Sequence, residues 1–98
     1  MSISIFRVAE LLDQKIVYTF HGGKRFTACV ESLEIHMEDG ILRSPYGEGP
    51  SPDDALGDYV LKIAGQPVVV MRTSPTTELR VACELTMPAD LTAVRERA

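Results

Sequence analysis

The sequence predicts an α+β domain in which one main helix packs on one face of an antiparallel sheet of about five strands. The expected order of elements is α-β-β-β-α-β-β, and the 98 residues are expected to form a single domain, residues 1–98. Three observations carry this prediction. Residues 79–87 alternate apolar and polar, residues 51–65 have a capped helical pattern, and Gly22-Gly23 marks a hairpin turn.

The first third of the chain predicts a short helix followed by a hairpin. Residues 6–12 place apolar side chains at helical spacing, although no clear N-cap precedes them. Residues 15–20 are rich in β-branched and aromatic side chains, which predicts a strand. Residues 21–24 form the turn, because Gly22 and Gly23 adopt positive φ at no steric cost.

The partner strand of this hairpin is expected over residues 25–35, with an interruption. Its apolar positions change phase by one residue near Glu31 and Ser32, which predicts a bulge or a break. Glu38-Asp39-Gly40 is a second turn signal. Residues 41–44 are then expected to form the third strand of a meander.

The strongest local signal is the helix that follows a loop at residues 45–52. Ser51 suits the N-cap, Pro52 suits the first helical position, and Gly65 suits the residue after the C-cap. One apolar stripe at helical spacing predicts the buried face: Ala55, Leu56, Tyr59, Val60 and Ile63. Leu61 lies off this stripe and is expected to be exposed.

Two strands and a short tail complete the predicted order. Pro67 ends the helix, and residues 68–71 form an apolar run typical of a buried strand. The alternation over residues 79–87 predicts a half-exposed antiparallel strand. We expect this strand to be a sheet edge that pairs with a second copy, hence a homodimer rather than a monomer. Residues 91–97 are expected to form one or two helical turns.

The composition excludes several classes of protein. The hydrophobic share of 45% and the charged share of 24% are ordinary for a soluble globular protein. The longest apolar run, residues 68–71, is far shorter than the roughly 20 residues that span a bilayer. No signal peptide is evident at residues 1–6, and two cysteines do not make a disulfide framework. We therefore expect a cytoplasmic protein that does not bind membranes.

The net charge of −4 comes from the middle of the chain. Residues 31–58 contain one arginine and eight acidic residues, a net charge of −7, whereas residues 1–30 carry +2 and residues 59–98 carry +1. One interpretation is a solvated surface that keeps the protein soluble. The other is an acidic face that steers the protein onto a basic partner, and it disfavours general binding to nucleic acid.

The residues typical of catalytic and metal sites are few and scattered. His21 and His36 lie near turns and fit no metal-binding spacing, while Cys29 and Cys83 fall inside predicted strands. Gly47-Glu48-Gly49 precedes a helix, as phosphate-binding loops do, but it lacks their lysine and acids surround it. We therefore expect no enzymatic activity, no metal and no cofactor.

Two known families share parts of this pattern. The order helix, three strands, helix over residues 6–64 resembles the double-stranded RNA-binding domain, whose lysines at the second helix grip phosphates. Pro52, Asp53 and Asp54 stand at those positions here. The resemblance therefore implies that layout without its RNA-binding residues.

The second resemblance concerns the start of the main helix. Its residues are Gly47-x-Gly49-x-Ser51-Pro52-x-x-Ala55-Leu56, with Tyr59 one turn later. This run is similar to small phage and prophage proteins and to HicB-type antitoxins, in which a small αβ domain covers a toxin. Asp53 and Asp54 stand where that family has acids. The resemblance implies a phage-encoded or antitoxin-like protein that acts by binding another protein.

Two functions from different classes follow from these observations. The first is an acidic, non-enzymatic inhibitor of a host defence system, similar to anti-CRISPR proteins, that occupies a basic surface of its protein partner. Its expected contacts are Glu38, Asp39, Glu48, Asp53, Asp54 and Asp58. The alternative is a nucleic-acid-binding accessory or antitoxin-like regulator. That function would use Lys15, Lys24, Arg25, Arg72, Arg80, Arg95 and Arg97.

Overall fold

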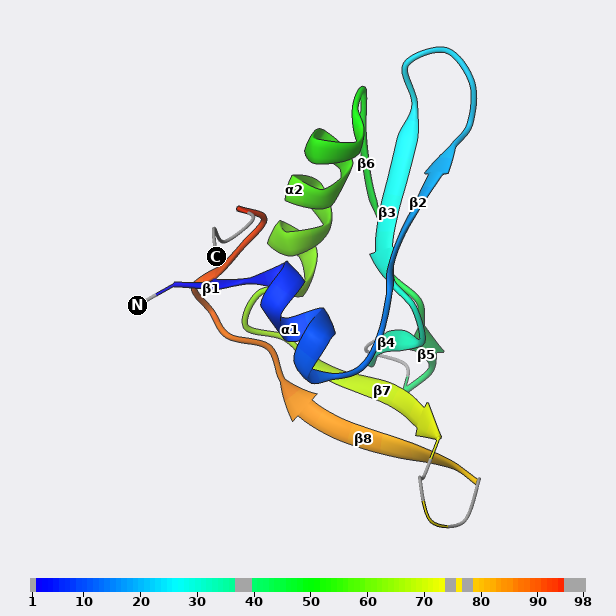
Figure 1. Cartoon of the computed structure of the whole chain (residues 1–98), viewed down its shortest axis with the longest axis vertical. Coiled ribbons are helices and arrows are strands. Elements are labelled where there is room, and N and C mark those ends of the chain that lie inside the picture. Colours follow the sequence, from blue (N-terminus) through cyan, green and yellow to red (C-terminus); the bar gives the residue numbers. More distant parts are fainter. Residues whose placement is uncertain (1, 37–39, 74–75, 77–78, 95–98) are drawn as a thin grey trace.

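The computed structural model of the protein describes residues 2–36, 40–73, 76 and 79–94. These residues form two helices and nine short strands, which confirms the α+β class (Figure 1). The strands lie in three small sheets rather than in the single sheet of about five strands that the sequence predicts. The chain therefore buries its apolar side chains among several small layers instead of between one helix and one sheet.

The main helix, α2, spans Pro52–Ile63 and confirms the predicted signal. The Ser51 hydroxyl oxygen accepts a hydrogen bond of 3.1 Å from the backbone amide of Asp54. Gly65 follows the C-cap with a φ of +71°, which a residue with a side chain rarely adopts. All five residues of the predicted stripe are buried, and Leu61 is 81% exposed.

The first sheet lies against α2. Its order is β2–β3–β6, formed by Ile16–Phe20, Phe26–Val30 and Gly47–Gly49 in antiparallel pairs. The predicted two-glycine turn joins β2 to β3. Ala28 and Val30 of β3 face the helix and are buried. Figure 1 shows α2 running alongside β6 and β3.

Strand β6 lies inside the segment that the sequence predicts as a loop. Two glycines allow its close approach to α2. A Cβ at Gly47 would overlap the carbonyl oxygen of Ala55 and the backbone of Tyr59. A Cβ at Gly49 would lie 2.6 Å from the Cβ of Asp54. This glycine-rich segment forms a strand because it hydrogen-bonds to β3 and because its glycines leave room for α2.

The second sheet has the order β5–β4–β7–β8, again with antiparallel pairs. Its strands are Leu33–His36 (β4), Leu42–Arg43 (β5), Pro67–Thr73 (β7) and Arg80–Thr86 (β8). The predicted break near Glu31 and Ser32 is confirmed, because Ser32 has a φ of +62° between β3 and β4. The phase change marks the point where the chain leaves one sheet and joins another.

The two ends of the described chain pair with each other. β1, Ile3–Ser4, and β9, Leu91–Thr92, form a parallel pair, so the expected helical turns are wrong for residues 91–94. The rest of that prediction, residues 95–97, lies outside the described residues. The short helix α1, Ile5–Leu11, follows β1, and the Ser4 hydroxyl oxygen accepts a hydrogen bond of 3.2 Å from the Phe6 amide. Ser4 is thus the N-cap that the sequence pattern does not reveal. Neither described helix has the length and apolar character needed to cross a bilayer.

One cluster of buried side chains joins both helices to strands of all three sheets. Its largest fully buried members are Tyr59, Ile5, Leu33, Leu56, Ile63 and Met87. Tyr59 occupies the centre of the α2 stripe, and its hydroxyl makes no hydrogen bond of good geometry within the described residues. Burial raises the pKa of Tyr59, and the nearby backbone of Val30 opposes this shift only in part.

Strand β8 is an edge of the second sheet and is half exposed, as its alternation predicts. The apolar side chains of residues 79–87 become more exposed from the end of β8 toward residue 79. Met87 is buried and Leu85 is partly buried, whereas Val81 is 46% exposed and Leu79 is 66% exposed. The apolar pattern thus extends beyond the part of the strand that the core covers.

Candidate functional site

Four of the six carboxylates predicted to bind a partner lie close together, and we call them the acidic surface: Glu48, Asp53, Asp54 and Asp58. Glu48 lies in β6 and the other three lie in the first two turns of α2. The Glu48 amide donates a 2.9 Å hydrogen bond to the carboxylate of Asp58, which ties the strand to the helix. Figure 1 shows β6 and the beginning of α2 at the upper end of the molecule, near the β2–β3 turn.

Glu48 forms an ion pair with an arginine of the β2–β3 turn. The Arg25 guanidinium lies 2.7 Å from its carboxylate, and both side chains are about half exposed. The hydrogen bond and the charge of Arg25 lower the pKa of Glu48. The pair links the β2–β3 turn to β6, so Glu48 has a contact within its own chain that the sequence does not reveal.

Asp58 is also engaged within the chain. Its carboxylate lies 3.1 Å from the Lys62 ammonium, one helical turn away. The hydrogen bond from the Glu48 amide and then the contact with Lys62 lower the pKa of Asp58. Lys62 further donates to the Tyr46 carbonyl oxygen at 2.9 Å and lies 5.5 Å from the centre of the Tyr46 ring.

The remaining two carboxylates are directed to solvent at the beginning of α2. The Ser51 hydroxyl donates to the Asp54 carboxylate at 2.8 Å, and the side chain of Asp54 stays exposed. Asp53 is exposed, and its side chain makes no hydrogen bond or ion pair with the described part of the chain. Asp53 and Asp54 are therefore the carboxylates of the acidic surface that are most accessible to a partner.

An exposed aromatic side chain lies on the same sheet as β6. Phe20, at the end of β2, is 61% exposed, and its ring centre lies 5.0 Å from that of Phe26. Phe26 is opposite both Phe20 and Gly49 in the sheet. The pair therefore lies on the α2 side of the sheet, next to the glycine that contacts Asp54.

The other predicted site residues are not brought to one surface. Glu38 and Asp39 lie outside the described residues, as do Arg95 and Arg97. The β2–β3 turn, which includes Lys24 and Arg25, lies at one end of the long axis (Figure 1). The ends of β7 and β8 that meet at the Thr73–Arg80 pair lie toward the other end. Within the described chain the basic residues therefore do not form a single patch.

A cavity of about 420 Å³ lies on the face of β3 that points away from α2. The sequence does not reveal this cavity. Its lining residues are His21, Arg25, Thr27, Cys29, Ser44, Pro45 and Tyr46. The His21 Nε2 atom lies 3.0 Å from the Thr27 hydroxyl oxygen. Burial, and to a lesser degree Glu31, raises the pKa of the Cys29 thiol, which disfavours the nucleophilic thiolate. In residues 2–36, 40–73, 76 and 79–94, no group of three His, Cys, Asp or Glu side chains is placed to hold a metal.

The lowered pKa values of Glu48 and Asp58 predict that acid destabilises this end of the molecule. Both carboxylates stabilise the fold while they are ionised, and this stabilisation is lost as the pH falls through their folded-state pKa values. We expect the thermal midpoint of unfolding to fall as the pH falls below the ordinary values of 4.5 and 3.8. The double variant Glu48→Gln, Asp58→Asn should have a smaller pH dependence between pH 6 and pH 3, measured by circular dichroism. An unchanged pH dependence would contradict these assignments.

The fold and the site together define a small α+β protein with an acidic surface at one end. Comparison with protein-family models, curated proteins and solved structures finds no match to this chain. The resemblances drawn from residues 6–64 thus stay predictions.

Proposed function

We propose that this chain is a small, non-enzymatic protein-binding module whose acidic surface occupies a basic surface of a partner protein. The observation that carries the proposal is the exposure of Asp53 and Asp54 at the beginning of α2. The charges of Glu48 and Asp58 are neutralised within the chain by their ion pairs with Arg25 and Lys62. The accessible negative charge is therefore that of the two aspartates at the beginning of α2. Phe20 adds an exposed aromatic side chain of the kind that anchors interfaces.

The expected partner is a protein that itself binds nucleic acid. Such proteins carry rows of lysine and arginine that contact phosphates, and carboxylates at the end of a small domain compete for those residues. In its specific form, the proposal is an inhibitor of a host defence system, encoded by a phage or another mobile element. The size of the chain and its acidic surface support this form.

The experiment compares partner capture by the wild type and by Asp53→Lys, Asp54→Lys. Tagged protein is incubated with host lysate at 150 mM and 500 mM salt, and the captured proteins are identified by mass spectrometry. We expect a nucleic-acid-binding protein that is captured at the lower salt concentration only. The double variant should bind the purified partner about tenfold more weakly.

The matched control is Glu10→Lys, which reverses an exposed carboxylate on α1, away from the acidic surface. It should bind like the wild type, and thermal unfolding should show that both variants are folded. The purified module should also displace nucleic acid from the captured partner. Equal binding by the wild type and the Asp53, Asp54 variant would refute the proposal, and recovery of nucleic acid itself would favour the regulator or accessory function.

A further inference from the structure

The outer edge of β8 has a defined hydrogen-bonding pattern. The Met87 amide donates to the Gln66 carbonyl oxygen at 2.9 Å, within the register that pairs Pro67 with Thr86. Hydrogen-bonded pairs alternate along antiparallel strands, so Leu85, Cys83 and Val81 direct their backbone groups toward β7. Pro67 fits this phase because it has no N–H to donate.

The intervening residues direct their backbone groups away from β7, toward the outer side of β8: Arg80, Ala82, Glu84 and Thr86. No described strand pairs with this side of β8. An edge of this kind is a template for an added strand. In the added strand, the residues that lie opposite Arg80, Ala82 and Glu84 must likewise direct their N–H and C=O groups toward β8.

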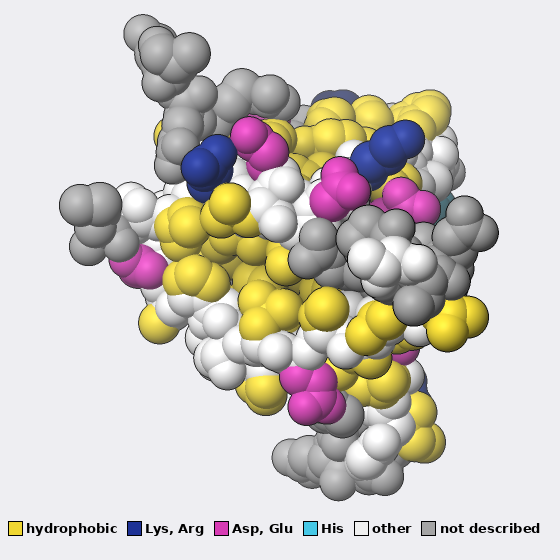
Figure 2. Space-filling view, turned by 60° about the horizontal axis from the view of Figure 1, so that its bottom comes forward, with side chains coloured by type: hydrophobic (Ala, Val, Ile, Leu, Met, Phe, Trp, Pro, Cys, Tyr) yellow, Lys and Arg dark blue, Asp and Glu magenta, His cyan; other side chains and the backbone are white. Residues whose placement is uncertain are grey.

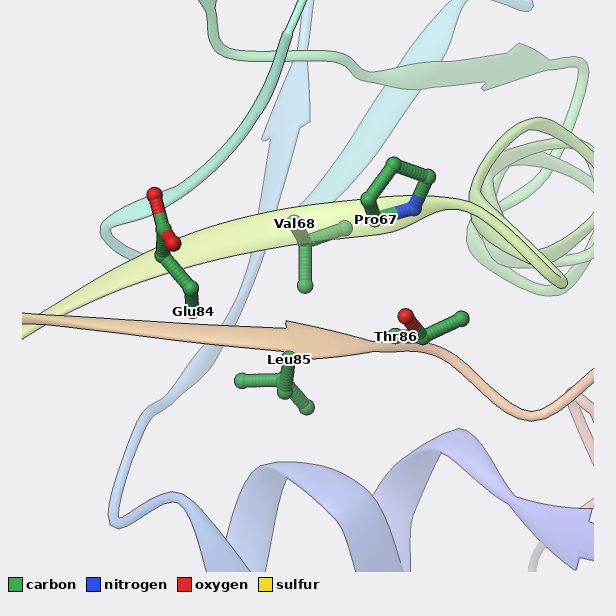
Figure 3. A pocket seen from close by; sticks show the side chains of 5 residues that line it. All are labelled: Pro67, Val68, Glu84, Leu85 and Thr86. Carbon is green, nitrogen blue, oxygen red and sulfur yellow. The ribbon is translucent and has the colours of Figure 1, made fainter.

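The side chains at this edge are apolar on one face and charged on the other. Leu79 and Val81 continue the row of Leu85, which points toward α1 in Figure 3, whereas Glu84 points away from it. A shallow cavity of about 290 Å³ lies where β7 begins and β8 ends, and it is lined by Pro67, Val68, Glu84, Leu85 and Thr86. Figure 2 shows hydrophobic side chains gathered across this end of the molecule, with charged side chains around them.

We propose that β8 pairs antiparallel with β8 of a second copy, across a two-fold axis at Ala82. This register places Arg80 opposite Glu84 of the second copy, twice in each dimer, with Ala82 opposite itself. The backbone groups of these residues point away from β7, so in this register the N–H and C=O groups of each strand face those of the other and can form hydrogen bonds. Two four-stranded sheets would join into one continuous sheet.

The apolar row supports the same register. On that face Leu79 lies opposite Leu85 of the second copy, and Val81 lies opposite Cys83 of the second copy. The two exposed members of the row, Leu79 at 66% and Val81 at 46%, thus gain apolar neighbours across the interface. The occupant of this edge is therefore another copy of the same chain.

Neighbouring registers lack this charge complementarity. An axis at Cys83 places Arg80 opposite Thr86 and Glu84 opposite Ala82, and it sets the two Cys83 thiols face to face. An axis at Val81 places Arg80 opposite Ala82. Only the axis at Ala82 pairs opposite charges at both ends of the shared segment.

The experiment measures the mass of the full chain by sedimentation and light scattering over a range of concentrations. We expect the 10.8 kDa chain to reach twice that mass. Arg80→Glu and Glu84→Arg should each raise the dimer dissociation constant by about tenfold, because each places like charges opposite at two positions. The double variant restores opposite charges and should dimerise nearly as well as the wild type.

Arg7→Glu is the matched control, because it reverses an exposed cation on α1 and should leave the dimer unchanged. Thermal unfolding verifies that each variant is folded. In a second readout, Val81→Cys should form a disulfide-linked dimer with Cys83 of the second copy under mild oxidation. A monomer at all concentrations up to about 1 mM, a double variant that fails to recover, or a dominant Cys83–Cys83 link in the wild type would overturn the proposal. The outcome is independent of the partner-binding function, because the two surfaces share no residue.

Discussion

Replacing Gly47 by alanine is expected to lower the free energy of unfolding by about 3 kcal/mol or more. The new Cβ would overlap the carbonyl oxygen of Ala55 and the backbone of Tyr59. These atoms belong to the α2 backbone and not to the end of a flexible side chain. Relief of the overlap therefore requires β6 and α2 to separate, which also opens the buried cluster around Tyr59.

The matched control is Gly57→Ala, in the middle of α2. A Cβ at Gly57 meets no atom within 4 Å, and alanine favours the helix over glycine. We expect this variant to gain about 1 kcal/mol in the free energy of unfolding. Urea denaturation followed by circular dichroism measures both variants. Similar midpoints for Gly47→Ala and the wild type would show that β6 does not lie against α2 as described.

Replacing Tyr59 by alanine is expected to cost about 3–5 kcal/mol, because it removes the largest fully buried side chain. Tyr59 is at the centre of the α2 stripe, and its neighbours come from several elements of the fold. The resulting cavity cannot collapse without moving the helix. Denaturant unfolding should show a lower midpoint at pH 7.

Replacing Tyr59 by phenylalanine separates the ring from the hydroxyl. The hydroxyl is buried without a well-formed hydrogen bond in the described residues. Its removal keeps the ring and abolishes the desolvation cost, so we expect a gain of about 1 kcal/mol. A loss of stability in this variant would mean that the hydroxyl makes a stabilising bond, to the Val30 backbone in the first instance.

Local patterns predict the elements whose stabilising contacts lie within a few residues. The capping Ser51, the terminating Gly65 and the apolar stripe of α2 are all close in sequence, and all are found where expected. The two-glycine turn and the alternation in β8 are of the same kind. Even the break between β3 and β4 is visible as a change of phase at Ser32.

Local sequence patterns do not predict the elements whose partners are far away in the sequence. Residues 47–49 become a strand because β3 offers hydrogen bonds and α2 requires glycines there. Likewise, Leu91–Thr92 becomes a strand because Ile3–Ser4 pairs with it from the other end of the chain. The division of the strands into three sheets follows from such pairings.

The same distinction holds for the acidic surface. The spacing of Asp58 and Lys62 by one helical turn is visible in the sequence and indicates their ion pair. The pairing of Glu48 with Arg25 requires the register of β3 against β6, which the sequence leaves open. The sequence therefore predicts that acidic residues are concentrated in the middle of the chain. It does not predict which carboxylates of the acidic surface form ion pairs and which stay accessible.

The pairing of β1 with β9 bears on how fast the chain folds. It closes a loop that contains nearly all described residues, and the contact between Ile3 and Leu91 is among the longest in sequence separation. Contacts of this kind raise the contact order and slow the folding of small domains. Helix α2 and the β2–β3 hairpin need only local closure and have no such delay. We therefore expect the β1–β9 pair to form late in folding and to complete the burial of Ile5 and Leu91 in the core.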